Sequence, residues 1–262
     1  MVTARHVAFV VLRALAPLRR TGTVRAAYFQ RKAPGLRWRI ASSDAAAVRV
    51  ALAPVLARLC EPRQGLAAWN ETVYEPELHL FGGSAAMHAV HALFDADTAA
   101  WSQLTALRRR GNLPYTDAVL ALAQGNELFS AALGGRPEEV WDAWCRLAVF
   151  HDLAPLAEGP EKRSRPTLAV LAAHPQALDA QSVIDALAAA QRRAGAALAE
   201  LAMQGQLTQG VRGVLAAVAL FGWNRIGLTP HERRHALTQA MGAWHPHRAP
   251  AREALPAEAL AA

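Results

Sequence analysis

The sequence has few of the residues that build a disulfide framework, a zinc site or a membrane anchor. Only two cysteines, Cys60 and Cys145, occur in 262 residues, and no CxxC pair is present. A disulfide-rich scaffold and a zinc ribbon are therefore excluded. No apolar run reaches the roughly 20 residues that span a bilayer. Arg13 interrupts the apolar stretch at 6–18, and no small-residue cleavage site follows it, so we expect a cytoplasmic protein.

Common nucleotide-binding and hydrolase motifs are absent as well. The sequence contains no Walker A loop, no Gly-rich dinucleotide fingerprint and no GxSxG elbow. His88, His91 and Asp95 share one face of a predicted helix, but this HxxH pair lacks the glutamate of metalloproteases. Packing or polar-face histidines are therefore favoured over a metal site, and we expect neither a metal nor a cofactor.

Positive charge is in excess. Lysine and arginine number 28 against 21 aspartates and glutamates, which gives a net charge of +7. Arginine dominates, and its planar guanidinium binds carboxylates and phosphates at two points. An acidic partner is therefore expected. Nucleic acid is one candidate, although the basic residues look dispersed and no recognition motif accompanies them.

Hydrophobic patterning predicts an α+β fold, with a single domain at 1–245 and a flexible tail at 246–262. The first part, 1–110, is expected to be rich in sheet. Its predicted elements are strands at 6–13, 24–31 and 36–40, a helix at 44–60 capped by Asp44, an extended segment at 67–81, and a helix at about 85–108 capped by Ser84. The second part, 111–245, is expected to be mostly helical, with helices at about 115–133, 137–150, 179–203, 208–222 and 230–242.

A group of cations lies around the turn signal Ala33-Pro34-Gly35. In "GLRWRI", Arg37 and Arg39 alternate with apolar residues, and so they share one face of a strand. The turn would bring Arg31 and Lys32 of the preceding strand close to them. The group is either a solvated basic face or a carboxylate-binding fork.

Two further groups stand out. Glu71, Glu75 and Glu77 surround Tyr74 with the same strand parity, so they either pair with Arg37 and Arg39 on a neighbouring strand or act as acid and base. Trp223, Asn224 and Arg225 follow an apolar helix and precede Gly227. Arg225 either bonds exposed helix carbonyls or points into a cleft between the two halves of the chain.

The strings "YFQRKAPGLRWRI", "VYEPELHLFGGSAAMHAVHALFDADT" and "ALFGWNRIGLT", in this order, resemble the thiopeptide-type bacteriocin biosynthesis domain family. That family includes the C-terminal glutamate-elimination domain of class I lantibiotic dehydratases and its stand-alone relatives. The resemblance extends from about residue 6 to about residue 241. It implies the elimination-domain fold, in which an N-terminal sheet with packed helices precedes a mostly helical half.

The resemblance also implies a maturation enzyme for ribosomally made peptides. Such a protein removes glutamate from glutamylated serine or threonine of a precursor peptide with a leader, which leaves a dehydroamino acid. The implied partner is a glutamyl-tRNA-dependent dehydratase. No membrane partner is implied, and a homodimer is compatible with the family.

Site residues are carried over position by position. Arg37 and Arg39 match the arginines that grip the glutamyl group, Arg31 matches a basic position in the preceding strand, and Arg225 matches the arginine of an Asn-Arg pair. The resemblance thus implies catalytic roles for Arg37, Arg39 and Arg225. His79 is a further catalytic candidate, because it lies next to Leu80, where the family carries an arginine. Substrate binding is expected of Arg31, Tyr74, Glu75, Trp223 and Asn224.

Two departures from the family pattern keep alternatives open. Leu80 stands where elimination domains carry an arginine, and Leu220 stands where they carry a histidine; Gly222 likewise replaces a histidine of related sequences. One alternative is the formal cycloaddition of two dehydroalanines by pyridine synthases, which share the scaffold. The other is a non-catalytic peptide-binding partner of a split dehydratase.

Overall fold

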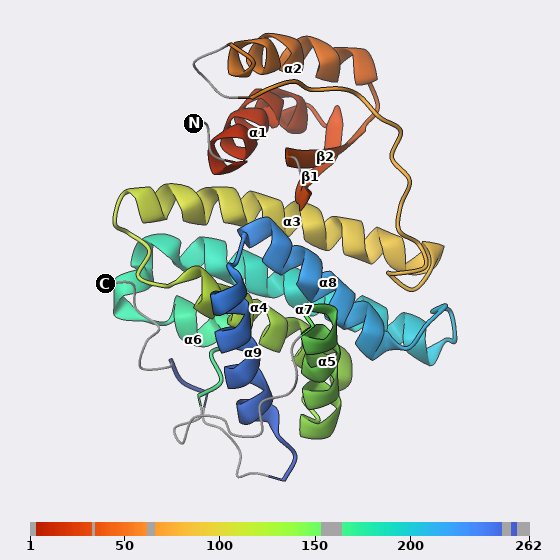
Figure 1. Ribbon diagram of the computed structural model, residues 1–262, viewed down its shortest axis with the longest axis vertical. Helices are drawn as coiled ribbons and strands as arrows, with labels where there is room; N and C mark the ends of the chain where they lie inside the picture. Colours follow the sequence, from red (N-terminus) through yellow and green to blue (C-terminus); the bar gives the residue numbers. More distant parts are fainter. Residues whose placement is uncertain (1–3, 33–34, 62–65, 153–163, 248–252, 256–262) are drawn as a thin grey trace. The chain divides into compact units, whose positions relative to one another are not determined.

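The computed structural model describes residues 4–32, 35–61, 66–152, 164–247 and 253–255. It divides the chain into two compact units, residues 1–76 and 77–262, and each unit is described by itself (Figure 1). Most of the described secondary structure is helical, and the described strands form one two-stranded sheet. The expected α+β class is confirmed, while the last described strand ends at Ser42, so the described part of 43–110 is not rich in sheet as expected. A single domain at 1–245 stays a prediction.

The first unit begins with a helix, so the prediction of a strand at 6–13 is wrong. Helix α1 (Ala4–Arg20) buries Ala8, Val11 and Leu15. These residues recur at the spacing of one helix face, which is the pattern of an amphipathic helix. The helix packs against α2 and β1.

Strands β1 (Val24–Lys32) and β2 (Gly35–Ser42) form an antiparallel hairpin, which confirms the strands predicted at 24–31 and 36–40. Two of the three residues of the predicted turn, 33 and 34, lie outside the described residues. Helix α2 (Ala45–Leu59) begins as predicted, because the Asp44 side chain accepts a hydrogen bond from the Ala47 amide. The core of the unit joins residues of α1, the hairpin and α2: Val11, Leu15, Val24, Ala27, Trp38, Ile40, Val48, Leu52 and Leu56.

No strand forms between residues 66 and 81, so the predicted extended segment does not join the sheet. Turns at 78–82 lead into α3 (Ser84–Arg109), whose N-cap is Gly83 rather than the expected Ser84. Gly82 and Gly83 have φ angles of 84° and 99°, a region that favours glycine. A Cβ on Gly82 would also lie 2.9 Å from Cγ2 of Val214, so this position has no room for a side chain.

The second unit is helical in its described part. Its helices α4, α5, α7, α8 and α9 confirm the predicted ones, although α8 continues through Gly222 and ends at Gly227. Helix α6 and the short 3-10 helix η1 were not predicted. The bounds are α4 (Asp117–Leu133), α5 (Pro137–Phe150), α6 (Leu168–Ala172), η1 (Pro175–Ala180), α7 (Gln181–Met203), α8 (Val211–Ile226) and α9 (Pro230–Trp244).

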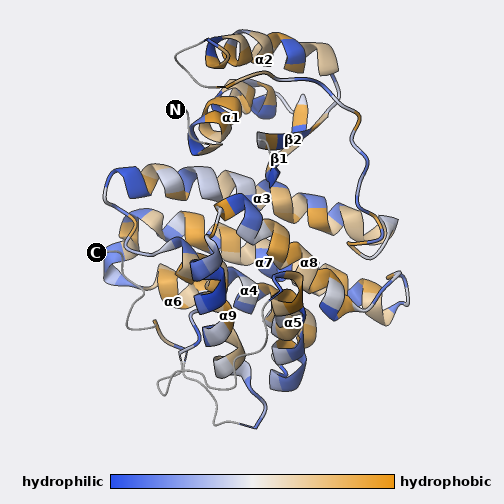
Figure 2. Ribbon diagram, in the orientation of Figure 1, coloured by the Kyte–Doolittle hydropathy of each residue, from blue (hydrophilic) through white to orange (hydrophobic). Residues whose placement is uncertain are grey.

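Helix α4 is the centre of this unit, since it contacts α5, α6, α7, α8 and α9. The ribbon of α8 is largely hydrophobic (Figure 2), as expected of a helix that is enclosed by others. The predicted tail at 246–262 lies mostly outside the described residues. None of the described helices is long and apolar enough to span a membrane.

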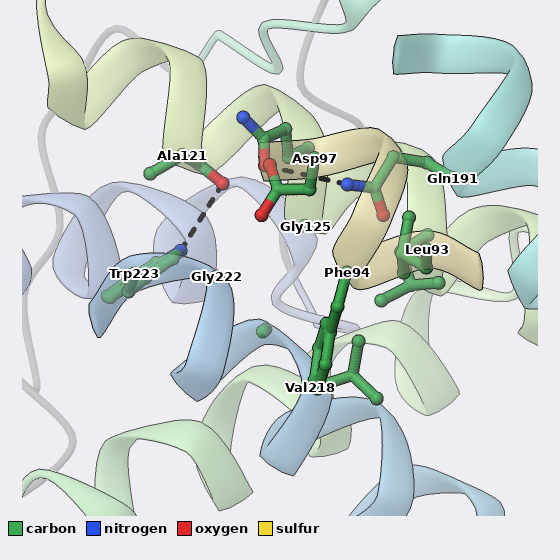
Figure 3. A pocket seen from close by; sticks show the side chains of 12 residues that line it. Leu93, Phe94, Asp97, Ala121, Gly125, Gln191, Val218, Gly222 and Trp223 are labelled. Carbon is green, nitrogen blue, oxygen red and sulfur yellow. Dashed lines mark hydrogen bonds between the residues drawn. The ribbon is translucent and has the colours of Figure 1, made fainter. Parts of the chain in front are cut away.

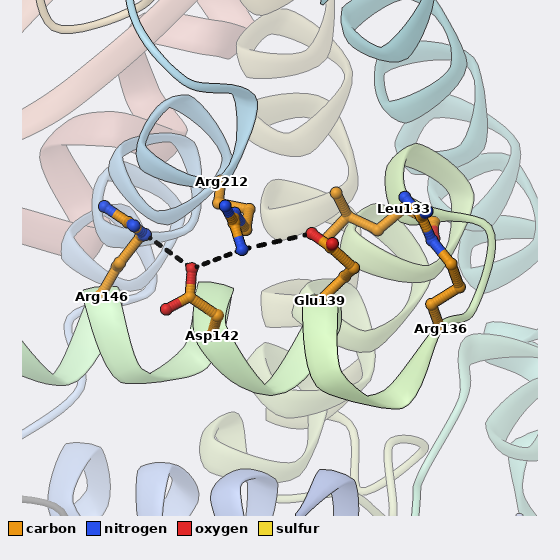
Figure 4. Close-up of polar contacts among 6 residues, drawn as sticks. All are labelled: Leu133, Arg136, Glu139, Asp142, Arg146 and Arg212. Atoms are coloured by element: carbon orange, nitrogen blue, oxygen red, sulfur yellow. Dashed lines mark hydrogen bonds and ion pairs between the residues drawn. The ribbon is translucent and has the colours of Figure 1, made fainter. Parts of the chain in front are cut away.

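A network of ion pairs fixes the first turn of α8 to α5 (Figure 4). Nη1 of Arg212 lies 3.1 Å from Oδ2 of Asp142 and 3.4 Å from Oε2 of Glu139. Asp142 also binds Nε of Arg146 at 2.9 Å. Because these side chains are partly exposed, the network orients the two helices more than it stabilises the fold.

Candidate functional site

The hairpin presents one cationic face. Tyr28 is opposite Arg39, and Gln30 is opposite Arg37. Residues directly opposite in an antiparallel pair point to the same side, and Lys32 has the same parity as Gln30. The cationic hairpin face therefore comprises Tyr28, Gln30, Lys32, Arg37 and Arg39. The shared face of Arg37 and Arg39 is confirmed.

Arg31 does not belong to this face. It is opposite Leu36, on the side where Phe29 packs against Trp38 with ring centroids 5.3 Å apart. That side contributes to the core of the unit. The expectation that Arg31 joins Arg37 and Arg39 is therefore wrong, and Lys32 is the third cation of the face.

Tyr74 holds Arg39 in position. The guanidinium carbon of Arg39 lies 4.6 Å from the centroid of the Tyr74 ring, and the Tyr28 hydroxyl donates a hydrogen bond to the Tyr74 hydroxyl at 2.9 Å. Arg39 also donates to the carbonyl of Trp38 at 3.2 Å. A guanidinium that is fixed on an aromatic ring keeps further N–H groups for a bidentate carboxylate. Arg37 beside it is exposed.

The glutamates of the following segment do not form the predicted strand pairs. Glu71 binds Nε of Arg49 on α2 at 2.9 Å, not Arg37 or Arg39. Glu75, next to Tyr74, is exposed. Its carboxylate is therefore accessible to a substrate.

His79 and Leu80 lie in the turns that precede α3. His79 is exposed, and the carbonyl of Leu80 accepts a hydrogen bond from the side-chain amide of Gln209. That bond fixes the turn to the loop before α8. The aliphatic side chain of Leu80 offers no charge in this place.

Arg225 is fully buried and forms an ion pair with Asp97 of α3. Its guanidinium carbon also lies 4.8 Å from the centroid of the Phe94 ring. Burial raises the pKa of Asp97, and the charge of Arg225 opposes that rise. The pair thus connects α8 to α3, and the enclosed Arg225 side chain is not accessible to a substrate.

Trp223 is a core residue rather than the substrate contact that was expected. It is 1% exposed, and its indole N–H donates to the carbonyl of Ala121 at 3.4 Å. The ring of His151 stacks on it at 5.8 Å, with an angle of 16° between the planes. Burial, together with the charge of Arg233, lowers the pKa of His151 to about 4. Nothing in the sequence pointed to this histidine. Asn224 is partly buried.

A small cavity lies beside this core, between α3, α4, α7 and α8 (Figure 3). Its polar lining is Asp97, Gln124 and Gln191, and the amide of Gln191 donates weakly to that of Gln124 at 3.5 Å. With a volume of about 20 Å³, the cavity has room for one water molecule. It is too small for a glutamyl group.

The predicted site residues thus fall into two groups. The first unit brings Arg37, Arg39 and Tyr74 together and leaves Arg31 on the opposite face of the sheet. The second unit contains His79, exposed, and Arg225, enclosed. In the described part of the chain, no three histidine, cysteine, aspartate or glutamate side chains are grouped so that they would hold a metal ion.

Comparisons with known proteins extend this description. A family model described as "Lantibiotic biosynthesis dehydratase C-term" matches residues 3–241. A search of curated proteins finds no match. The fold is similar to that of the tRNA-dependent lantibiotic dehydratase MibB from Microbispora sp. 107891, with a TM-score of 0.66 and 20% sequence identity. The match covers 92% of this chain but 27% of MibB, so the chain spans about a quarter of that protein's length.

Proposed function

The chain belongs to the family of lantibiotic biosynthesis dehydratase C-terminal domains, and from this we propose that it eliminates glutamate from glutamylated serine or threonine in a ribosomally made peptide. The reaction is a β-elimination. A base removes the Cα proton of the modified residue, the Cβ–O bond breaks, and glutamate leaves as a carboxylate. The product is a dehydroamino acid.

The cationic hairpin face is the observation that carries this proposal. A glutamyl ester, joined through its side-chain acyl group, keeps a free α-carboxylate. Arg39, fixed on the Tyr74 ring, and the exposed Arg37 offer a two-point grip for that carboxylate. The same charges stabilise the negative charge that develops on the enolate and on the leaving group.

Proton transfer needs a group with an accessible lone pair. We assign this role to His79, which is exposed in the turns before α3. Glu75 is exposed beside Tyr74, and we assign it to contact with the substrate's free α-amino group. The buried Arg225 has a structural role, because its ion pair with Asp97 connects α8 to α3.

The proposed setting is the cytoplasm, beside a glutamyl-tRNA-dependent dehydratase that modifies the precursor peptide first. The similarity to MibB, described as tRNA dependent, supports such a partner. The leader of the precursor is expected to bring the peptide to the enzyme. No cofactor is needed, since the elimination is a proton transfer and a heterolytic bond cleavage.

A pyridine-forming cyclase is the second candidate. Leu80 and Leu220 place aliphatic side chains where elimination domains carry charged or titratable ones. Cycloaddition of two dehydroalanines depends on their orientation more than on a strong base. The third candidate is a non-catalytic partner of a split dehydratase. Such a protein would bind the peptide through the cationic hairpin face but would not convert it.

Mass spectrometry separates these functions. The purified protein is incubated with a glutamylated precursor peptide and, separately, with the same peptide carrying dehydroalanines. The proposal predicts repeated loss of glutamate from the first and no change in the second. Cyclisation of the second peptide would instead show that the protein is a pyridine-forming cyclase. If neither peptide reacts, the remaining function is that of a non-catalytic peptide-binding partner.

A further inference from the structure

The net positive charge of the chain comes from its first unit. Residues 1–76 contain 12 lysines and arginines but 4 aspartates and glutamates, a net charge of +8, whereas the whole chain carries +7. The second unit is therefore close to neutral. A codon bias toward arginine would act on both units alike, so it does not explain the difference. The basic residues are dispersed along the chain, as expected, but their excess over acidic residues is found in the first unit.

Many of these cations face solvent. Arg13, Arg20, Arg25 and Arg58 are exposed, and none forms an ion pair with another described residue. We call these four the basic surface. None of the four belongs to the cationic hairpin face or to the residues assigned to the reaction.

Helix α1 illustrates how the basic surface is built. Arg13 and Arg20 are seven residues apart, which places them about 10 Å apart on one side of the helix. The buried side of α1 is formed by Ala8, Val11 and Leu15. Arg25 lies on β1 and Arg58 in the last turn of α2. The charges are thus distributed over two helices and a strand rather than along one groove.

We infer that the basic surface binds the phosphate backbone of a structured RNA. A nucleic acid carries one charge per nucleotide over a wide area, so scattered cations can each meet a phosphate. A short acidic peptide would need carboxylates at matching positions. The exposed side of α1 offers arginine but no asparagine or glutamine, the residues that read adenine edges.

Recognition of this kind follows backbone and shape rather than sequence. The net charge of the unit also steers a polyanion toward it, with a rate that falls as salt rises. The choice of RNA over DNA rests on the proposed function, in which the glutamate to be eliminated was delivered by an aminoacylated RNA. The preference for nucleic acid does not rest on it.

The test is binding of the full-length protein to fluorescent, non-aminoacylated tRNA, measured by anisotropy between about 50 and 200 mM salt. Arg13→Glu with Arg20→Glu is compared with Arg193→Glu and Arg234→Glu, which change the charge equally on exposed positions of the second unit. The first variant should bind more weakly, and its plot of log K against log salt should be less steep by about two. The control should keep the wild-type slope.

The inference is overturned if both variants behave alike or if the Arg13 and Arg20 variant keeps the wild-type slope. Equal affinity for a DNA duplex of the same length overturns the assignment to RNA, and tighter binding of polyglutamate overturns the assignment to nucleic acid. The binding measurement contains no peptide substrate, so its result does not depend on whether the protein eliminates glutamate. The Arg13 and Arg20 variant should still eliminate glutamate at the wild-type rate.

Discussion

The ion pair between Asp97 and Arg225 joins two helices inside the second unit. Their side chains are 5% and 0% exposed. Removal of one partner leaves an uncompensated buried charge, which costs about 3–5 kcal/mol. We predict that Asp97→Ala lowers the free energy of unfolding by about this amount, as measured by urea denaturation.

A double variant provides the control for this pair. Asp97→Leu with Arg225→Met removes both charges and replaces them with side chains of related size, so it should be more stable than Asp97→Ala. If the double variant instead loses as much free energy of unfolding as the Asp97 and Arg225 single variants added together, the ion pair is not the source of the destabilisation. The partners are 128 positions apart in the sequence, which explains why sequence patterning gave no sign of the pair.

His151 should make stability depend on pH. Its pKa is lowered from an ordinary 6.5 to about 4 in the folded chain. The folded state therefore favours the neutral ring, so this contribution is complete above about pH 6.5 and is lost as the pH falls toward 4. We predict that the melting temperature of the wild type decreases between about pH 7 and pH 5.

His151→Phe is the matched comparison, because phenylalanine retains a ring to stack on Trp223 but does not titrate. Its melting temperature should fall less over the same range. Parallel curves for the two proteins would show that other groups cause the pH dependence.

The arginines show what strand periodicity predicts and what it does not. Alternation along one strand was enough to place Arg37 and Arg39 on a common face. The position of Arg31 depends on the register between two strands, and the register makes Leu36 its neighbour. The cation–π contact of Arg39 with Tyr74 joins segments that no local pattern connects.

Among the elements, helices with a clear apolar period were predicted well, and the N-terminal helix was not. Its apolar run is rich in valine and short, and such a run does not distinguish a strand from a buried helix face. The segment at 67–81 alternates like a strand, but it has no neighbour to pair with among the described strands. Pairing partners are a tertiary property, which local patterns do not contain.

Gly195 allows α7 and α4 to approach closely. A Cβ on Gly195 would lie 2.7 Å from the Leu128 carbonyl oxygen and 2.9 Å from Cβ of Ala131. Because a helix backbone does not shift easily, we predict that Gly195→Ala destabilises the protein by about 1–3 kcal/mol in urea denaturation.

Gly213 on α8 is the control, because its nearest neighbour would be Oε1 of Gln209 at 3.7 Å. Gly213→Ala should stabilise the protein by about 0.5–1 kcal/mol, since alanine loses less backbone entropy in a helix. Equal effects of the two substitutions would mean that helix propensity, not the contact between α4 and α7, decides the result.

At the scale of the whole molecule, the chain combines a small basic unit with a larger, nearly neutral helical unit. The family could be recognised from three short strings, even though identity to MibB is 20%. No composition shift marks the division at residue 76, because the sequence around it mixes apolar residues, glutamates and one proline. The uneven distribution of charge is present in the sequence, but the net charge of each unit can be counted only when the division at residue 76 is known.

The central claim is that the cationic hairpin face grips the glutamyl carboxylate during elimination. Single-turnover release of glutamate from a glutamylated peptide tests it directly, with thermal unfolding as the check on folding. Arg37→Ala with Arg39→Ala should slow release by about 100-fold or more at unchanged stability, whereas Arg31→Ala, on the other face, should retain most of the rate. A double variant that releases glutamate at the wild-type rate, or an Arg31→Ala variant that is equally slow, would contradict the claim.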